Sequence, residues 1–235
     1  IQIAQMVIPG RVPSAGDTLL NMVGCAIGCL LGTLRMPRFA AATSISTGPL
    51  PVPAILALLL VVWNLRPFIP SIDLQLLINN IKALLESPIP HPLWTYQGVV
   101  TWLIIFHFLD SDEPRLIPEK RYPALVLITL ALGFFIVGNS VNIDRIAGAL
   151  IALPLWPVVR RLPRPPLLSF LTFLLIVGIS FEPFELQSVA SRFNWVPFSG
   201  ALNGNLLINV LATTKKLLLY WSLIWLLVQC RVRLS

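Results

Sequence analysis

Charged side chains are scarce in this chain: they make up 11% of its residues, whereas hydrophobic residues make up 56%. A soluble domain carries roughly 25% charged residues, so this composition excludes an ordinary soluble globular protein. Divided into spans of about 20 residues each, a chain of 235 residues has room for about seven membrane-spanning helices. We therefore expect an all-α fold, a polytopic transmembrane helix bundle.

Cysteine and histidine, which supply most disulfides and many metal sites, are also scarce. Cys25, Cys29 and Cys230 are odd in number and lie inside apolar runs, and the chain has two His. This usage favours buried thiols over a disulfide or a metal site. The sequence contains no P-loop, dinucleotide fingerprint, HExxH or GxSxG motif. We expect no metal and no cofactor, and an enzymatic role is left open without being favoured.

The basic residues outnumber the acidic ones and give a net charge of +7. A nucleic-acid-binding domain gathers such residues in a solvated patch. Here they are scattered between apolar runs, so we exclude nucleic acid as a partner and interpret them as determinants of membrane orientation. Membrane lipids are the expected partners, and a multi-pass protein of the bacterial inner membrane is the expected location.

Apolar runs separated by Pro, Gly and charged residues predict the membrane spans. They lie at 18–34, 52–66, 93–109, 123–138, 145–159, 165–181 and 216–230. Two longer interruptions, 66–92 and 181–216, each begin near a Pro-Phe pair and contain a Leu- and Asn-rich amphipathic stretch, which predicts two segments lying in the membrane interface. Their similar layout suggests an internal duplication.

The basic residues also indicate the topology. If the first span runs inward, Arg35 and Arg38 are cytoplasmic, and alternation places the loops near 115–121 and 160–164 and the end of the chain on the same side. The N-terminal stretch and both amphipathic segments then lie outside the cytoplasm.

The most specific motif opens the first predicted span. Asp17, Asn21, Gly24, Gly28 and Gly32 recur at intervals of three or four residues, so on a helix they form one stripe. The glycines would let another helix pack closely. Prolines and glycines just before Asp17 would turn the chain and bring Arg11 back to it, so we predict an ion pair there.

These residues resemble a known family signature. Gln5, Arg11, Asp17, Asn21, Gly24 and Gly28 are similar in type and spacing to the motif of the VanZ-like family of small helical membrane proteins. The stretch "RFNWVPF", with Arg192, Asn194, Pro197 and Phe198, is similar to the opening half of that family's domain. The family is associated with bacterial resistance to teicoplanin-type glycopeptide antibiotics, so the resemblance implies a cell-envelope role.

The order of these motifs suggests a piece of a longer, multi-unit protein, and Ile1 in place of Met agrees. We divide the chain into residues 1–38, the end of a VanZ-like unit; 39–164, a central transmembrane region that would be a degenerate copy; and 165–235, the start of a further unit. The family usually has an acid three residues before the glutamine, whereas this chain has Gln2, which puts any role of that acid in doubt.

Arg11, Asp17 and Asn21 lead to the functional hypothesis of an outward-facing pocket that binds an envelope headgroup, such as the phosphate of a lipid or lipid-linked cell-wall precursor, and so contributes to glycopeptide tolerance. A structural ion pair is the competing interpretation. The alternatives from other classes are an integral-membrane enzyme acting on a lipid-linked phosphate substrate and a small-molecule transporter.

Other polar residues have simpler explanations. His107 and Asp110 are spaced like a base and its orienting partner, but a packed histidine is the commoner outcome. Asp144 and Arg145 suggest a local cap and charge pair in a short outer turn. Lys215 and Lys216 are expected to reach the outer headgroups.

Overall fold

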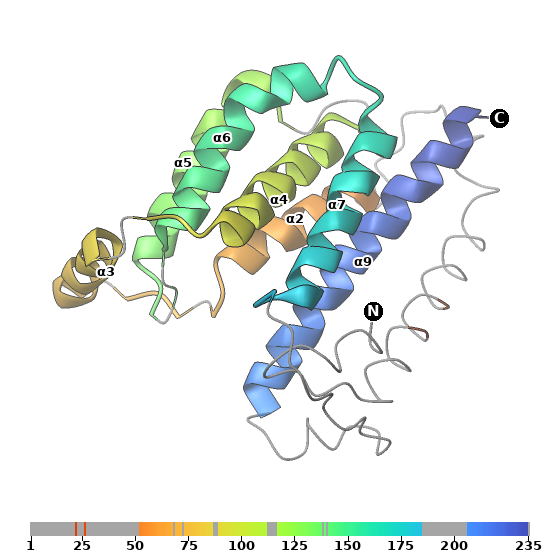
Figure 1. The fold of residues 1–235 in the computed structure, drawn as a ribbon. Helices are drawn as coiled ribbons and strands as arrows, with labels where there is room; N and C mark the ends of the chain where they lie inside the picture. The colour runs from red at the N-terminus through yellow and green to blue at the C-terminus, as the bar shows by residue number, and fades with distance from the viewer. Residues whose placement is uncertain are drawn as a thin grey trace, which may run out of the picture. The chain divides into compact units, whose positions relative to one another are not determined.

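The computed structural model describes Met22, Ala26 and residues 52–67, 69–71, 73–86, 89–111, 117–137, 139, 141–184 and 206–234. Apart from one isolated bridge between Pro70 and Ile136, regular structure in these residues is helical (Figure 1). The elements are α2 (Val52–Asn64), α3 (Leu74–Glu86), α4 (Pro92–Asp110), the 3-10 turn η2 (Glu119–Arg121), α5 (Tyr122–Phe134), α6 (Ile143–Val159), α7 (Arg164–Phe181) and α9 (Leu206–Leu234). The predicted all-α fold is confirmed for this part of the chain.

The chain divides into two compact units. A central unit runs over Gly48–Leu171, and a terminal unit combines Ile1–Thr47 with Thr172–Ser235. The division falls within α7, so α7 contributes its first half to the central unit and its second half to the terminal unit. The polar sites described below lie in the central unit.

Helix α4 is the core of the central unit and packs against both α2 and α6. Its residues from Trp102 to Leu109 are all buried, and the helix is apolar around most of its circumference, as expected for an element enclosed on several sides. Proline shapes the helix starts: Pro92 opens α4 and Pro123 lies in the first turn of α5, where a missing N–H costs little.

Two glycines bring the backbones of α4 and α6 into contact. A methyl group added at Gly148 would lie 2.8 Å from the Cα of Gly98 and 2.9 Å from the carbonyl oxygen of Thr95. A methyl group added at Gly98 would meet the Cα of Gly148 at 3.2 Å. Small residues at helix crossings allow this close approach. The close crossing predicted for the 24–32 glycines lies outside the described residues, whereas this one was not predicted.

Two of the described helices are long and apolar enough to cross a membrane, Arg164–Phe181 and a stretch of α9, Val210–Cys230. At 1.5 Å per residue they extend roughly 27 and 32 Å, close to the thickness of a bilayer core. Helices α2 and α5 have 13 residues each, which is about 20 Å. The prediction of about seven spans is therefore supported at two positions, and the first predicted span lies outside the described residues.

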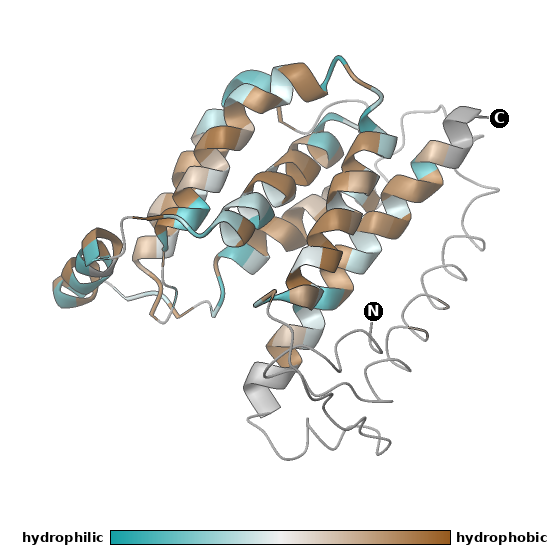
Figure 2. Ribbon diagram, in the orientation of Figure 1, coloured by the Kyte–Doolittle hydropathy of each residue, from teal (hydrophilic) through white to brown (hydrophobic). Residues whose placement is uncertain are grey.

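The predicted amphipathic helix in the first interruption is present as α3. Leu74, Ile78, Ile81 and Leu85 form an exposed apolar stripe, and Gln75, Asn79, Lys82 and Glu86 form a polar one. In Figure 2 hydrophilic and hydrophobic colours accordingly alternate around α3, while hydrophobic residues dominate the lengths of α4 and α6. The second predicted amphipathic segment falls mainly on residues that the structure does not describe.

The close contact of Gly98 and Gly148 predicts the direction in which substitution of either glycine changes the stability of the protein. Because alanine favours a helix by about 1 kcal/mol over glycine, Gly148→Ala would stabilise an uncrowded α6. We expect it instead to destabilise the protein by roughly 1–3 kcal/mol, the usual cost of overpacking, and Gly98→Ala to cost less. Thermal unfolding of the purified protein in detergent measures both, and a raised melting temperature for Gly148→Ala would show that the helices do not touch there.

Candidate functional site

Two backbone hydrogen bonds, which we call the backbone clip, join the α2–α3 and α5–α6 connections at one end of the central unit. The N–H of Ser71 donates to the carbonyl oxygen of Phe135 at 2.8 Å, and the N–H of Val137 donates to that of Ile69 at 2.9 Å. From α3, the side-chain amide of Asn80 also donates to the carbonyl oxygen of Phe134, at 2.9 Å. The α2–α3 and α5–α6 connections are thus held together, and the polar residues that they carry meet at this end.

Asn64, Asn139 and Arg145 form what we call the asparagine–arginine cluster. Nη1 of Arg145 donates to Oδ1 of Asn139 at 2.6 Å and, less closely, to the carbonyl oxygen of Asn64 at 3.4 Å. Nδ2 of Asn139 donates to the same carbonyl oxygen at 3.1 Å. One backbone carbonyl at the end of α2 therefore receives both side chains, and the partly buried guanidinium is held by neutral oxygen atoms.

Arg66 adds a second positive charge beside this cluster. Its guanidinium carbon lies 4.2 Å from the centroid of the Trp63 ring, a cation–π contact. Arg66 follows Asn64 by two residues, and the Asn64 carbonyl oxygen accepts a hydrogen bond from Arg145, so two like charges lie at this end of the unit. Among the described residues, no carboxylate lies within ion-pair distance of either arginine. Within the described part of the chain, neither guanidinium group therefore has a direct ion-pair partner.

A small hollow adjoins the cluster, with room for about one water molecule. Arg145 and Asn139 meet Thr129 and Trp102 in its lining. The full lining is Asn64, Trp102, Thr129, Leu130, Gly133, Asn139, Val141 and Arg145. Oγ1 of Thr129 donates to the carbonyl oxygen of Leu125 at 2.8 Å, so the wall of the hollow has both polar and apolar parts.

Asp144 and Arg145 do not form the predicted charge pair. Oδ1 of Asp144 accepts the backbone N–H of His91 and a long contact of 3.5 Å from the Thr95 hydroxyl, so it binds the start of α4. The N-cap residue of α6, Asn142, makes no side-chain capping bond. Consecutive helical residues point in different directions, which is why these neighbours bind different elements.

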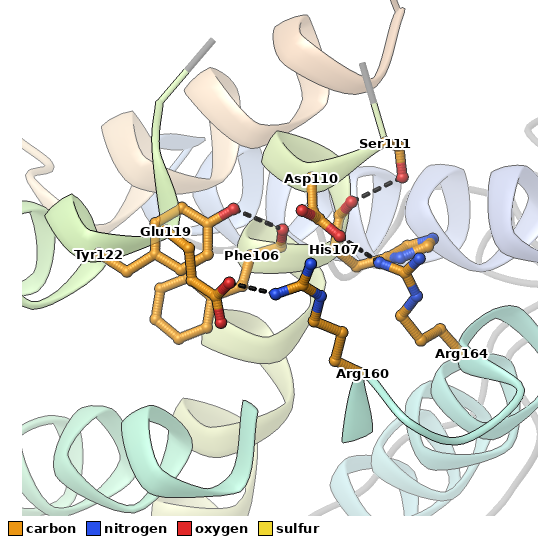
Figure 3. A network of polar contacts seen from close by, with 8 residues as sticks. All are labelled: Phe106, His107, Asp110, Ser111, Glu119, Tyr122, Arg160 and Arg164. Carbon is orange, nitrogen blue, oxygen red and sulfur yellow. Dashed lines mark hydrogen bonds and ion pairs between the residues drawn. The ribbon is translucent and has the colours of Figure 1, made fainter. Parts of the chain in front are cut away.

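Acid–arginine pairs occupy the opposite end of the central unit. The carboxylate of Asp110, at the end of α4, binds Arg164 at the start of α7, and Glu119 in η2 binds Arg160 just after α6. Figure 3 shows both arginines reaching the two acids from the α6–α7 connection. The side chain of Asp110 is 3% exposed, so its charge depends strongly on this partner.

Aromatic side chains pack directly beneath these pairs. Phe106 stacks on Tyr122, with ring centroids 4.8 Å apart, and meets Trp156 edge-on. The Tyr122 hydroxyl donates to the carbonyl oxygen of Phe106 at 3.4 Å. His107 is 2% exposed. The spacing of His107 and Asp110 thus gives a packed histidine and an ion-paired acid at this end.

The residues that the sequence singled out most strongly lie outside the described part of the chain. They are Gln5, Arg11, Asp17, Asn21, Gly24, Gly28, Gly32, Arg192, Asn194, Pro197 and Phe198. Their predicted roles stay predictions. The described residues contain no group of three His, Cys, Asp or Glu side chains that could hold a metal ion.

Sequence reasoning missed the asparagine–arginine cluster. Asn64 and Arg145 are 81 residues apart, and no local motif connects them. A weak signal exists, because Asn64 lies in the outer end of the predicted span 52–66 and Asn139 directly follows the predicted span 123–138. Polar residues at such positions often have partners.

The Asp110–Arg164 pair gives a stability test. Asp110→Asn removes a buried negative charge and leaves Arg164 unneutralised, so we expect the free energy of unfolding to fall by about 3 kcal/mol. The matched control is Glu86→Gln in the exposed pair of α3, whose partners Lys82 and Glu86 are 71% and 64% exposed and which should change stability by less than about 1 kcal/mol. Equal effects in thermal unfolding would contradict the assignment.

Comparison with known proteins finds no match for this chain among protein-family models, curated proteins or solved structures.

Proposed function

We propose that this chain is a multi-pass protein of the bacterial inner membrane whose outward-facing polar end engages a component of the cell envelope. The observation that carries the proposal is the difference between the two ends of the central unit. One end pairs its buried acid with an arginine, whereas the other holds Arg66 and Arg145 without a carboxylate within ion-pair distance among the described residues. Guanidinium groups without a direct ion-pair partner are suited to an anionic ligand.

Apolar surface on the helices supports the membrane placement. Leu127, Ile128 and Leu132 are exposed on α5, and Leu150 and Val158 are exposed on α6. Large apolar side chains exposed in such number on neighbouring helices favour an interaction with lipid or protein. Together with the two helices that are long and apolar enough to cross a bilayer, this favours a helix bundle whose sides face acyl chains.

The distribution of charge supports the orientation. The acid–arginine end carries Lys120, Arg121, Arg160, Arg161 and Arg164 against Asp110 and Glu119. The asparagine–arginine end balances its basic residues Arg66, Lys82 and Arg145 with Asp73, Glu86 and Asp144. Short cytoplasmic loops are enriched in Lys and Arg, so the acid–arginine end faces the cytoplasm and the asparagine–arginine cluster faces outward.

The VanZ-like resemblance and a contribution to glycopeptide tolerance belong to the same proposal. The family motif at 5–28 was assigned to the outer face on the same alternation that places Arg145 there. Both would then present arginine at the outer headgroup level, where lipids and lipid-linked cell-wall precursors carry phosphate.

Cysteine labelling in whole cells tests the orientation. In a variant with Cys25, Cys29 and Cys230 replaced by Ser, single cysteines are placed by Asn142→Cys, before α6, and Leu162→Cys, between α6 and α7. Both positions are exposed. A membrane-impermeant maleimide should label position 142 in intact cells and position 162 only after permeabilisation.

The reverse pattern would contradict an outward-facing cluster, and recovery of the chain in the soluble fraction would contradict the membrane placement. Engagement of an envelope component has its own measurement in native mass spectrometry of the protein released from its membrane. We expect a retained envelope lipid, and spectra that show only the bare chain would contradict that part of the proposal.

A further inference from the structure

The guanidinium of Arg145 has donor capacity that the protein does not use. Its hydrogen bonds to Asn139 and Asn64 both come from Nη1. Arginine carries five N–H groups, and Nη2 and Nε have no acceptor among the described residues. Since Nη1 is fixed by two oxygen atoms, the orientation of the whole planar group is fixed, and the unused N–H groups are held ready for an acceptor.

Nearby carboxylates are committed to other groups. Asp144 accepts hydrogen bonds at the start of α4, Asp73 accepts the N–H of Gln75 at 2.8 Å, and Glu86 pairs with Lys82 on α3. Arg66 stacks on Trp63 and makes no side-chain hydrogen bond within the described chain. Because Arg66 follows Asn64 by two residues and Arg145 contacts the Asn64 carbonyl, an anion at this end would meet both positive charges.

The size of the hollow limits how such an anion could bind. A space for about one water molecule admits a single oxygen atom of a larger group and leaves the rest of the ligand outside the hollow. In the polar wall, Asn139 donates one amide N–H to the Asn64 carbonyl and has a second N–H for that oxygen, whereas the Thr129 hydroxyl already donates its proton to the Leu125 carbonyl. The apolar wall of Trp102 and Val141 lowers the local polarity and strengthens charged hydrogen bonds.

We propose that Arg66 and Arg145 together bind the phosphate group of an anionic ligand, with one phosphate oxygen entering the hollow. A carboxylate is planar and matches one guanidinium fork, whereas the tetrahedral oxygens of phosphate can receive hydrogen bonds from two guanidinium groups that approach from different directions. The site rests on the proposed function, because an outward-facing cluster at headgroup level would meet phosphate continuously. The phosphate could belong to a lipid headgroup or to a free anion.

The experiment uses the purified full chain and two probes. In neutral detergent, sodium phosphate is titrated against sodium chloride of equal ionic strength, and binding is followed by calorimetry. In nanodiscs, phosphatidic acid in phosphatidylcholine is compared with phosphatidylcholine alone by native mass spectrometry. Binding of both probes indicates a site for the phosphate group itself, and binding of phosphatidic acid alone indicates a lipid site.

Three variants assign the binding to residues. Arg66→Gln should fold normally, because Arg66 only stacks on Trp63, and should weaken binding about tenfold or more, as expected for losing charged hydrogen bonds. Arg145→Lys keeps the charge but loses the planar fork, and should weaken binding similarly. Arg161→Gln removes an exposed arginine from the opposite end and should leave binding unchanged.

If neither probe binds, or if all three variants lose binding equally, the proposed site is wrong. These outcomes are separable from failure of the proposed function. If position 142 is labelled from outside and the chain retains an envelope lipid but neither probe binds, the orientation and engagement stand while the phosphate site is wrong. If position 142 is labelled only after permeabilisation, the outward orientation is wrong whatever the probes show.

Discussion

The partly buried guanidinium of Arg145, held by neutral oxygen atoms instead of a carboxylate, is the constraint on which our account of this protein depends. Removing a charge from water is costly unless it is paired and hydrogen-bonded. Here the Asn139 side chain and the Asn64 carbonyl provide hydrogen bonds without neutralising the charge. The backbone clip between residues 69–71 and 135–137 keeps these groups together, so the fold holds at one end of the central unit a cation that has no direct ion-pair partner among the described residues.

The two ends of that unit stabilise their buried charged side chains in different ways. At the acid–arginine end, Asp110 and Arg164 neutralise each other over a stacked aromatic core of Phe106, Tyr122 and Trp156, which suits a structural role. At the other end, the Asn139 side chain and the Asn64 carbonyl hold Arg145 by hydrogen bonds, and no described carboxylate lies within ion-pair distance of it. The backbones of α4 and α6 approach each other closely at Gly98 and Gly148, and both ends include residues at the termini of this helix pair.

Much of the helical fold could be predicted from the sequence, because apolar runs bounded by proline and charge are local features. The α3 helix was predicted from its periodicity, and α4 to α7 fall close to the predicted runs. The full set of spans was not confirmed, because α2 and α5 are too short by themselves to cross a bilayer core, and composition alone does not set where a helix ends.

The polar site could not be predicted for a different reason. Asn64, Asn139 and Arg145 come together only through the clip and the packing of separate helices, and sequence separation hides such contacts. The predicted charge pair between Asp144 and Arg145 was wrong for a related reason, because consecutive residues on a helix point in different directions. The Gly148 crossing had a visible signal in the small residues Gly148, Ala149 and Ala152, a pattern typical of close helix packing. The motif residues at 5–32 lie outside the described residues, and their roles stay predictions.

The most direct test is a solid-state NMR measurement of the dipolar coupling between phosphorus and the guanidinium nitrogens of uniformly ¹⁵N-arginine-labelled protein in bilayers containing phosphatidic acid, with the Arg145→Lys variant used to assign the signal. We predict a coupling in the wild-type protein that corresponds to direct hydrogen bonding, with nitrogen and phosphate oxygen about 2.8 Å apart, and that is clearly weaker in the variant because the Arg145 contribution is lost. A wild-type spectrum without a coupling attributable to Arg145 would contradict the claim that this unneutralised arginine binds phosphate.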